Sequence, residues 1–496
     1  MTETERPQDT RQRGGANRPG VMKLLLVLGI CIFSSAGARA GEARPNIVFI
    51  LADDLGWRDL SCYGSSFYET PHLDRLAKQG VRFTNAYAAC NVCSPTRASI
   101  LTGKYPARLH LTDWLPGRKD MPSQKLARPI IRQELPLEEV TVAAALKEAG
   151  YATAFIGKWH LGGPAFYPEK HGFDLNIAGC ELGHPPSYMS PYRIPTLPDG
   201  PDGEYLTDRL ADEACQVIER SKDRPFFLYF SSYAVHTPLQ AKPALLEKYR
   251  KKLAALPPSQ EPEFISDHGR QVRHLQRLPV YAAMMESLDD SVGRIMAKLD
   301  ELKLAENTIV IFTSDNGGLS TSEGTPTSNT PLRMGKGWNY EGGIREPLIV
   351  KWPGVTAAGT ECASPVISTD YYPTFLEMAG AAARPVQHVD GVSMVSLLKG
   401  GSGTVDRPFF WHYPHYSNQG GTPAGAIRLG DWKLIEWYED DRVELYNLKD
   451  DPGESRDLAQ AVPERAADLQ AQLQAWRQRV DAQMPSPNPE YRPNAK

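Results

Sequence analysis

Short apolar runs that end abruptly in polar residues constrain the fold more than any other feature of this chain. Residues 47–52 are all apolar and lead directly into Asp53 and Asp54. A continuous apolar run of this length is typical of a strand buried on both faces, as in a parallel sheet. By the same criterion we expect strands at residues 46–52, 151–156, 226–231, 308–313 and 348–350.

Helical patterns separate these strands. Thr141 is a typical helix cap and Gly150 a typical helix end, and Ser368 is expected to cap a later helix. The helices expected from such signals and from apolar periodicity lie at residues 71–79, 142–149, 280–304 and 368–379. Helices that alternate with buried strands indicate an α/β fold, with a large, mostly parallel sheet sandwiched by helices.

Beyond residue 400 the pattern changes. Residues 432–437 and 443–446 flank a turn at residues 439–441, which predicts an antiparallel hairpin. Residues 463–483 are predicted to form a terminal helix. We therefore expect a large domain at residues 41–400, a smaller α+β domain with antiparallel strands at 401–484, and a loose tail at 485–496.

The N-terminus has the pattern of a secretion signal at residues 1–40. Lys23 precedes an apolar stretch at residues 24–33, and Ala38-Arg39-Ala40 offers a cleavage site between small residues. The stretch is too short to span a bilayer, which takes roughly 20 apolar residues. We expect an exported protein, periplasmic or extracellular, with no transmembrane span.

Bulk composition excludes several classes of protein. Hydrophobic residues make up 41% and charged residues 23% of the 496 residues, as in an ordinary globular protein. The formal net charge of −4 gives no indication of nucleic-acid binding, so an anionic substrate must be attracted by local basic residues. The seven cysteines are too few to form a disulfide framework for a chain of this length, although one bridge is compatible with them.

Polar residues capable of chemistry gather where the predicted strands end. In open α/β sheets, ligands bind beyond the carboxyl ends of the strands. The residues expected at this edge are Asp53, Asp54, Lys158, His160, His236, Asp315 and Asn316. The pairs Asp53-Asp54 and Asp315-Asn316 supply only oxygen ligands, which suit Ca²⁺ or Mg²⁺. Together they predict a metal site at this edge.

The most specific motif lies at residues 93–106, which read Cys-Ser-Pro-Thr-Arg-Ala-Ser-Ile-Leu-Thr-Gly-Lys-Tyr-Pro. A helix that starts near Ser94-Pro95 aims free backbone N–H groups at Cys93 and at a bound anion. The spacing of cysteine, proline and arginine, followed by Leu-Thr-Gly, resembles the signature of the sulfatase family. The resemblance implies that Cys93 is oxidised to formylglycine, whose hydrated aldehyde attacks sulfur, and that Arg97 holds this hydrate.

Three further matches extend the resemblance. Lys158 and His160 lie in Gly-Lys-Trp-His-Leu-Gly, which resembles the second sulfatase signature. The resemblance implies that Lys158 binds a sulfate oxygen and that His160 is the base that helps to expel sulfate. His236 matches the family's histidine near the leaving oxygen, and Lys336 matches its sulfate-binding lysine. Either could protonate the leaving alcohol, and we favour His236.

The resemblance also implies a cofactor, a partner and a substrate. In sulfatases, the residues that match Asp53, Asp54, Asp315 and Asn316 bind one Ca²⁺ together with the formylglycine at position 93. The family has an alkaline-phosphatase-like fold and hydrolyses sulfate esters, here expected on a carbohydrate. Asp315 is also expected to help activate the hydrate. A formylglycine-generating maturation enzyme is the implied partner, and a sulfated small molecule or glycan the implied substrate.

Other interpretations remain open from the sequence. The same fold is compatible with a phosphomonoester or phosphonate hydrolase, and a non-catalytic glycan-binding protein could retain it without the modification. The aromatic and histidine side chains at Trp411, His412, Tyr413, His415 and Tyr416 fit either a sugar pocket or an ordinary strand with its turn. A serine that the family has near the sulfate does not map onto residues 172–184.

Overall fold

The computed structural model describes residues 44–402 and 407–493. The predicted signal peptide at residues 1–40 lies outside the described residues. At the centre lies a nine-stranded sheet in the order β11-β2-β10-β9-β1-β6-β4-β5, with β12 also paired to β2. Its strands are β1 (Asn46–Ala52), β2 (Val81–Tyr87), β4 (Ala152–Gly157), β5 (Leu175–Ile177), β6 (Phe226–Ser231), β9 (Thr308–Ser314), β10 (Arg345–Lys351), β11 (Thr360–Cys362) and β12 (Val366–Ile367).

The sheet is mostly parallel, as predicted. β1 pairs in parallel with β6 on one side and with β9 on the other. β10 runs antiparallel to both of its neighbours, β9 and β2. Ala52 lies opposite Ser314 in the β1–β9 register, so Asp53 and Asp315 leave the sheet side by side. The carboxyl edge of the sheet therefore carries the polar residues that the sequence placed there.

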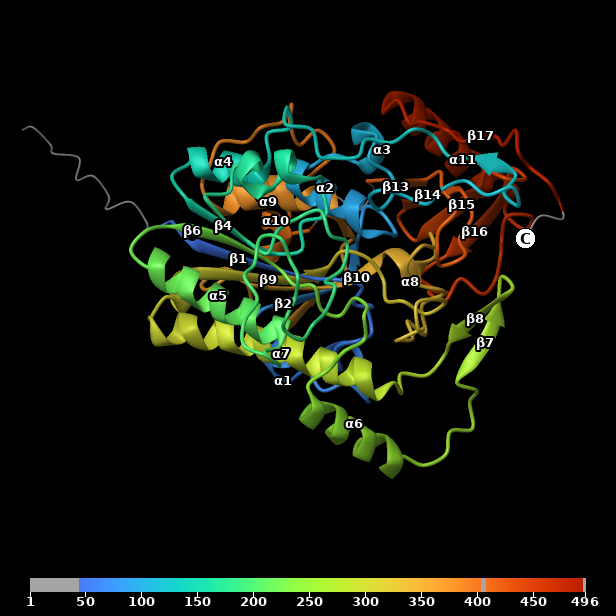
Figure 1. Cartoon of the computed structure of the whole chain (residues 1–496). Helices are drawn as coiled ribbons and strands as arrows, with labels where there is room; N and C mark the ends of the chain where they lie inside the picture. Colours follow the sequence, from blue (N-terminus) through green and yellow to red (C-terminus); the bar gives the residue numbers. More distant parts are fainter. Residues whose placement is uncertain (1–43, 403–406, 494–496) are drawn as a thin grey trace, which may run out of the picture. The chain divides into compact units, whose positions relative to one another are not determined.

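Helices cover both faces of this sheet (Figure 1). Along β1, Val48, Ile50 and Ala52 belong to the core that includes α1, α5 and α7, whereas the alternate residues face the core formed with α2, α4 and α9. Among the described residues, none of the helices combines the length and apolar character that a membrane span requires. The helices are α1 (Pro71–Gln79), α2 (Cys93–Thr102), α3 (Pro106–Leu109), α4 (Val142–Glu148), α5 (Leu206–Ser221), α6 (Pro243–Ala255), α7 (Pro279–Glu301), α8 (Glu341–Ile344), α9 (Tyr371–Met378), α10 (Val395–Leu398) and α11 (Pro463–Arg479).

A second, four-stranded antiparallel sheet follows in the C-terminal part, in the order β13-β14-β15-β16. The predicted hairpin is its β15–β16 pair. Leu469, Leu473 and Trp476 of α11 pack into the same core as this sheet. The strands are β13 (Phe409–Tyr413), β14 (Ala424–Leu429), β15 (Trp432–Trp437) and β16 (Arg442–Asn447). Two short pairs lie elsewhere: β7 (Phe264–Asp267) with β8 (Arg270–Arg273), and β3 (Leu126–Ala127) with β17 (Ser486–Pro487).

The structure differs from the sequence-based expectations at a few element ends. Ser368 does not cap α9, because its hydroxyl accepts the backbone N–H of Ala89 and a 3-10 turn precedes the helix. α11 ends at Arg479 rather than at residue 483. The tail, expected to be loose from residue 485, is attached where β17 pairs with β3. The start of α9 and the attachment of the tail depend on residues distant in sequence, which the pattern of neighbouring residues does not reveal. The six described cysteines are all free.

A buried ion network ties the C-terminal sheet to the segment that carries Lys336. Lys433 of β15 is fully buried, and its Nζ lies 3.0 Å from Glu341 of α8 and 2.8 Å from Glu454. Glu454 also accepts the backbone N–H of Glu341 at 2.6 Å. Removing the ammonium group would leave two buried carboxyl groups next to each other without a cation between them.

Lys433→Met is therefore expected to lower the free energy of unfolding by about 3–5 kcal/mol, the usual cost of breaking a buried ion pair from one side. The measurement is the urea midpoint followed by tryptophan fluorescence. Lys399→Met, at an exposed lysine, is the matched control and should have the same urea midpoint as the wild type. Equal midpoints for the two variants would contradict a structural role for Lys433.

Candidate active site

Cys93 is the first residue of α2 and is 3% exposed. Val92 before it is extended, so the free N–H groups of the first helical turn lie beside the thiol, as predicted. The Sγ atom lies 3.4 Å from Nδ1 of His160. Burial raises the pKa of the Cys93 thiol. The helix start and the Gly-Lys-Trp-His-Leu-Gly segment thus meet at one point, although 67 residues separate the two side chains.

His160 is held in one orientation. Its Nε2 lies 2.7 Å from the carbonyl oxygen of Leu115, which can only accept, so Nε2 carries the proton and Nδ1 faces Cys93 as a free base. Burial and the nearby Lys158 hold the pKa of His160 well below its usual value. Gly183 lies so close that a Cβ there would come within 2.6 Å of the imidazole ring. A neutral, fixed imidazole therefore lies next to position 93.

The four predicted oxygen donors converge at the carboxyl ends of β1 and β9. The backbone N–H of Asp54 donates to Asp315 Oδ1 at 3.2 Å, and Asn316 Nδ2 donates to Asp54 Oδ1 at 2.7 Å. All four side chains, those of Asp53, Asp54, Asp315 and Asn316, are at most 1% exposed. The register of two neighbouring parallel strands accounts for this convergence, because each pair of oxygen donors directly follows its strand.

Three buried cations balance the three carboxylates. Lys158 Nζ lies 2.8 Å from both oxygens of Asp53. Arg97 donates two N–H groups to Asp315 Oδ2 at 2.9 and 2.7 Å, and a third to the carbonyl oxygen of Lys158 at 2.8 Å. Asp315 and Asp53 raise the pKa of Arg97 despite its burial. Arg97 is thus 2% exposed and part of the site, not a surface arginine.

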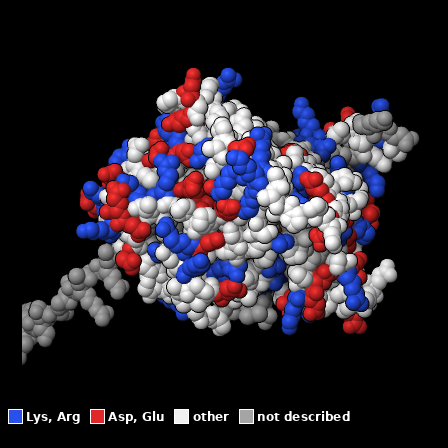
Figure 2. All heavy atoms as spheres, turned by 90° about the horizontal axis from the view of Figure 1, so that it is seen from below, with Lys and Arg blue, Asp and Glu red and all other residues white. Residues whose placement is uncertain are grey.

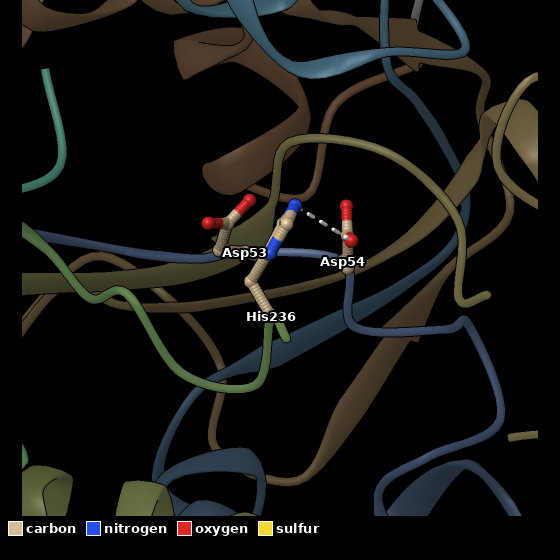
Figure 3. Close-up of side chains that lie close together, drawn as sticks. All are labelled: Asp53, Asp54 and His236. Carbon is tan, nitrogen blue, oxygen red and sulfur yellow. Dashed lines mark ion pairs between the residues drawn. The ribbon is translucent and has the colours of Figure 1, made fainter. Parts of the chain in front are cut away.

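Lys336 joins the site from the glycine-rich segment before α8. Its Nζ lies 2.8 Å from Asp54 Oδ1 and 3.2 Å from Nε2 of His236. His236 Nε2 itself lies 3.4 Å from Asp54 Oδ2, the pair marked in Figure 3. Burial opposes ionisation of Asp54, but Lys336 and His236 hold its pKa below the usual range. Burial raises the pKa of Asp53 to about 8, even though Lys158 opposes this shift.

These residues fit a divalent cation. Ligand atoms of Asp53, Asp54 and His236 lie within 4.8 Å of one another, and this buried cluster could bind a metal ion (Figure 3). Asn316 Oδ1 is buried and has no hydrogen-bond partner, although its amide nitrogen has two. A buried carbonyl oxygen without a partner is costly unless it serves a ligand. Carboxylate and amide oxygens are the donors that Ca²⁺ and Mg²⁺ prefer.

A pocket of about 470 Å³ opens over Cys93, His160, His236 and Lys336. A cavity of this size holds a small organic ligand. The pocket is lined by Cys93, Trp114, Leu115, Pro116, His160, Glu181, Leu182, Gly183, His184, His236, Thr237, Glu323, Lys336, Asn418 and Gln419. Lys158, Arg97 and the carboxylates lie behind this surface. The predicted catalytic and metal-binding candidates are therefore brought together in one site.

The structure also identifies pocket residues that the sequence did not. Trp411, His412 and Tyr413 lie in β13 and do not line the pocket, nor do His415 and Tyr416; Asn418 and Gln419, just beyond them, do. The ring of His184 stacks on that of His236, with centroids 6.0 Å apart. No serine is among the described residues that line the pocket, which agrees with the gap in the motif at residues 172–184.

On the face shown in Figure 2, Lys and Arg side chains are interspersed with Asp and Glu. The positive charge that could hold an anion is instead concentrated in buried side chains behind the pocket. Attraction of an anion must therefore act over short distances, where the low dielectric strengthens it.

Comparisons with known proteins agree with this geometry. The family description "Sulfatase" matches residues 45–381, and "N-sulphoglucosamine sulphohydrolase, C-terminal" matches residues 334–483. A protein named "Sulfatase" from Formosa agariphila is 35% identical, with 91% of this chain and 92% of the relative covered. Human arylsulfatase A is 34% identical, with 91% of each chain covered.

Solved structures show the same architecture. The crystal structure described as Ps i-CgsB in complex with k-i-k-neocarrahexaose aligns with a TM-score of 0.72 and 30% identity. The alignment covers 89% of this chain and 94% of the other. A family match over residues 45–381, together with relatives of this identity along nearly the whole chain, shows that the chain belongs to the sulfatase family and is a sulfuric ester hydrolase.

Proposed function

We propose that the chain is an exported, calcium-dependent sulfatase that acts on a sulfated carbohydrate through a formylglycine formed from Cys93. The observation that carries the proposal is the position of Cys93: at a helix N-terminus, 3.4 Å from the free Nδ1 of His160, and beside three buried carboxylates with their cations. A structural cysteine needs none of these neighbours.

The proposal requires a metal ion and a modified residue 93, and residues of the candidate site could hold both. Asp53, Asp54, Asp315 and Asn316 would hold the Ca²⁺, with residue 93 as a further ligand, and the ion would supply positive charge next to the sulfate oxygens. Formylglycine at position 93 would supply, as its hydrate, a hydroxyl group that can attack sulfur. The unpartnered Asn316 Oδ1 supports this ligand set.

Side chains of the chain itself bind the sulfate group and transfer the protons. Lys158 and Lys336 bind the sulfate oxygens and offset the charge that develops on them. Arg97 fixes Asp315 and, through the Lys158 carbonyl, the segment that carries His160. His160, neutral and with Nδ1 toward position 93, accepts the proton that must leave the residue-93 hydroxyl for sulfate to depart. His236 Nδ1 donates to the carbonyl oxygen of Thr237 at 2.9 Å, so Nε2 must first receive a proton from Lys336, 3.2 Å away, before it donates one to the leaving oxygen.

The carbohydrate part of the proposal rests on the pocket and on relatives. The pocket is large enough for a sugar ring and offers Trp114, whose buried indole N–H has no partner. The similar structure with 30% identity is described as a complex with neocarrahexaose. Two assays test this assignment. The first measures release of sulfate from a panel of defined sulfated saccharides, and the second compares the turnover of an aryl sulfate with that of the aryl phosphate that has the same leaving group. Faster turnover of the phosphate would favour a phosphomonoesterase.

The proposal includes export, maturation and the division of the chain into domains. Residues 1–40 direct export, and a formylglycine-generating maturation enzyme acts on Cys93. We divide the rest into a catalytic domain at residues 41–400 and a C-terminal subdomain at 401–484. Asn418 and Gln419 of this subdomain line the pocket, which supports a part for it in substrate binding.

The mass of the peptide that holds Cys93 tests the modification. In enzyme produced with a maturation enzyme, this peptide should be lighter than its cysteine form. Cys93→Ala should lower kcat/KM by at least about 10³-fold, because the nucleophile is lost. Cys90→Ala is the matched control and should retain both the mass change and the activity. An active enzyme with unmodified Cys93 would refute the nucleophile assignment.

Removal of the metal ion is expected to abolish turnover and to lower the melting temperature. Calcium at 100 times its dissociation constant adds about 2.7 kcal/mol of stability. The measurements are thermal unfolding with and without a chelator and the calcium content of the purified protein. Asn316→Ala should reduce calcium content, whereas Asn307→Ala, at an exposed asparagine, should not. Equal melting temperatures with and without chelator would argue against a resident ion.

The acid role of His236 predicts a dependence on the leaving group. His236→Ala should lower kcat/KM on a sugar sulfate by about 10²–10⁴-fold, because an alkoxide needs a proton to depart. The loss on 4-nitrophenyl sulfate should be much smaller, since nitrophenolate leaves unaided. His110→Ala, at a histidine outside the pocket, is the control. Equal losses on both substrates would assign the proton to another group, with Lys336 the next candidate.

A further inference from the structure

The charges of the pocket are distributed unevenly between its base and its edge. At the base, Lys336 and the buried Lys158 offer positive charge for one sulfate group. Of the described residues that line the pocket, Lys336 is the only lysine or arginine, whereas two lining side chains are carboxylates, Glu181 and Glu323. Both of these glutamates are exposed, so they lie toward solvent, and we call them the acidic rim.

Glu323 is held in place by the C-terminal subdomain. Its Oε1 accepts the side-chain amide N–H of Gln419 at 2.6 Å, and Gln419 is itself 3% exposed. The carbonyl oxygen of Gln419 accepts the Thr321 hydroxyl at 2.9 Å and the Trp338 indole N–H at 3.3 Å. Glu323 has a φ of 52°, in the left-handed region that costs a residue with a Cβ free energy. The hydrogen bond to the buried Gln419 therefore fixes the carboxylate of Glu323 beside the pocket.

Glu181 enters the rim from the segment that follows Lys158 and His160. Its Oε2 accepts the hydroxyl proton of Tyr167. Neither rim carboxylate has a lysine, arginine or histidine nitrogen within 4.0 Å among the described residues. Arg270 packs against Gly420, next to Gln419, but does not line the pocket. The hydrogen-bond partners of both glutamates are neutral, so neither carboxylate forms an ion pair with a described residue.

We propose that Glu181 and Glu323 select substrates in which the sulfated ring carries no second anionic group. The inference rests on the proposed sulfate-ester hydrolysis and narrows its substrate class. A singly sulfated neutral sugar, or one with an amino group, places its sulfate among the basic residues and only uncharged or cationic groups near the rim. A ring with a second sulfate or a carboxylate brings two like charges together and binds less well.

A matched pair of aryl sulfates separates this charge effect from sugar recognition. We compare 3-carboxyphenyl sulfate with its uncharged carboxamide analogue, both followed by sulfate release. A unit charge several ångströms from a rim carboxylate, partly screened by water, is expected to lower kcat/KM for the acid relative to the amide by about threefold to tenfold. Because ions screen exposed charges, this ratio should approach one as sodium chloride is raised toward 1 M.

Variants test the assignment to the rim. In the double variant Glu181→Gln/Glu323→Gln, the acid-to-amide ratio of kcat/KM should rise toward one, even at low salt. Glu306→Gln removes a negative charge from an exposed site outside the pocket and should leave the ratio at its wild-type value. A wild-type ratio near one at low salt, or a ratio that the double variant does not change, would overturn the proposed role of the acidic rim in selection. Both esters would still be hydrolysed in that case. Sulfate-ester hydrolysis itself would then remain established.

Discussion

The parallel register between β1 and β9 is the constraint on which the site depends. Because Ala52 pairs with Ser314, the acidic residues that follow each strand must emerge next to each other. Three carboxylates buried together would repel one another and would not remain ionised alone. Lys158, Arg97 and Lys336 counter this repulsion, and each arrives from a different segment of the chain. The same cations are then available to an anionic substrate.

Apolar runs predicted five strands of the central sheet, at residues 46–52, 151–156, 226–231, 308–313 and 348–350, whereas the candidate site residues came from motifs that resemble those of the sulfatase family. Asp53 and Asp315 directly follow two of these strands, whereas Cys93 and Lys336 do not directly follow any strand. The rest of the pocket was not predictable in this way. Trp114, His184, Glu323 and Gln419 lie in loops whose positions depend on contacts across the whole chain, such as the Glu323–Gln419 hydrogen bond. Ser368 shows the same limit, since a distant backbone N–H takes the hydroxyl that would otherwise cap a helix.

Buried charge occurs both in the active site and behind it. In the Lys433–Glu341–Glu454 network, Glu341 lies five residues beyond Lys336 in sequence, and its ion pair with Lys433 fixes α8. Such networks rarely add stability over an apolar core, but they do define one arrangement. The backbone of Gly317 donates to Gly343 at 3.1 Å, so α8 also contacts the segment that carries Asn316. The C-terminal sheet thereby helps to position both Asn316 and Lys336.

Separate groups can therefore control affinity for sulfate and selection among sulfated compounds. The basic residues at the base are buried and paired with carboxylates of the candidate metal site, so the proposed chemistry requires them. The rim glutamates are exposed and their hydrogen-bond partners are neutral, so their charge can change without breaking an ion pair. Exposed charges act weakly one at a time, yet a factor of a few in kcat/KM is enough to discriminate between competing substrates. On this argument, substrate range in such a pocket is set by its loops, while the strand ends retain the chemistry.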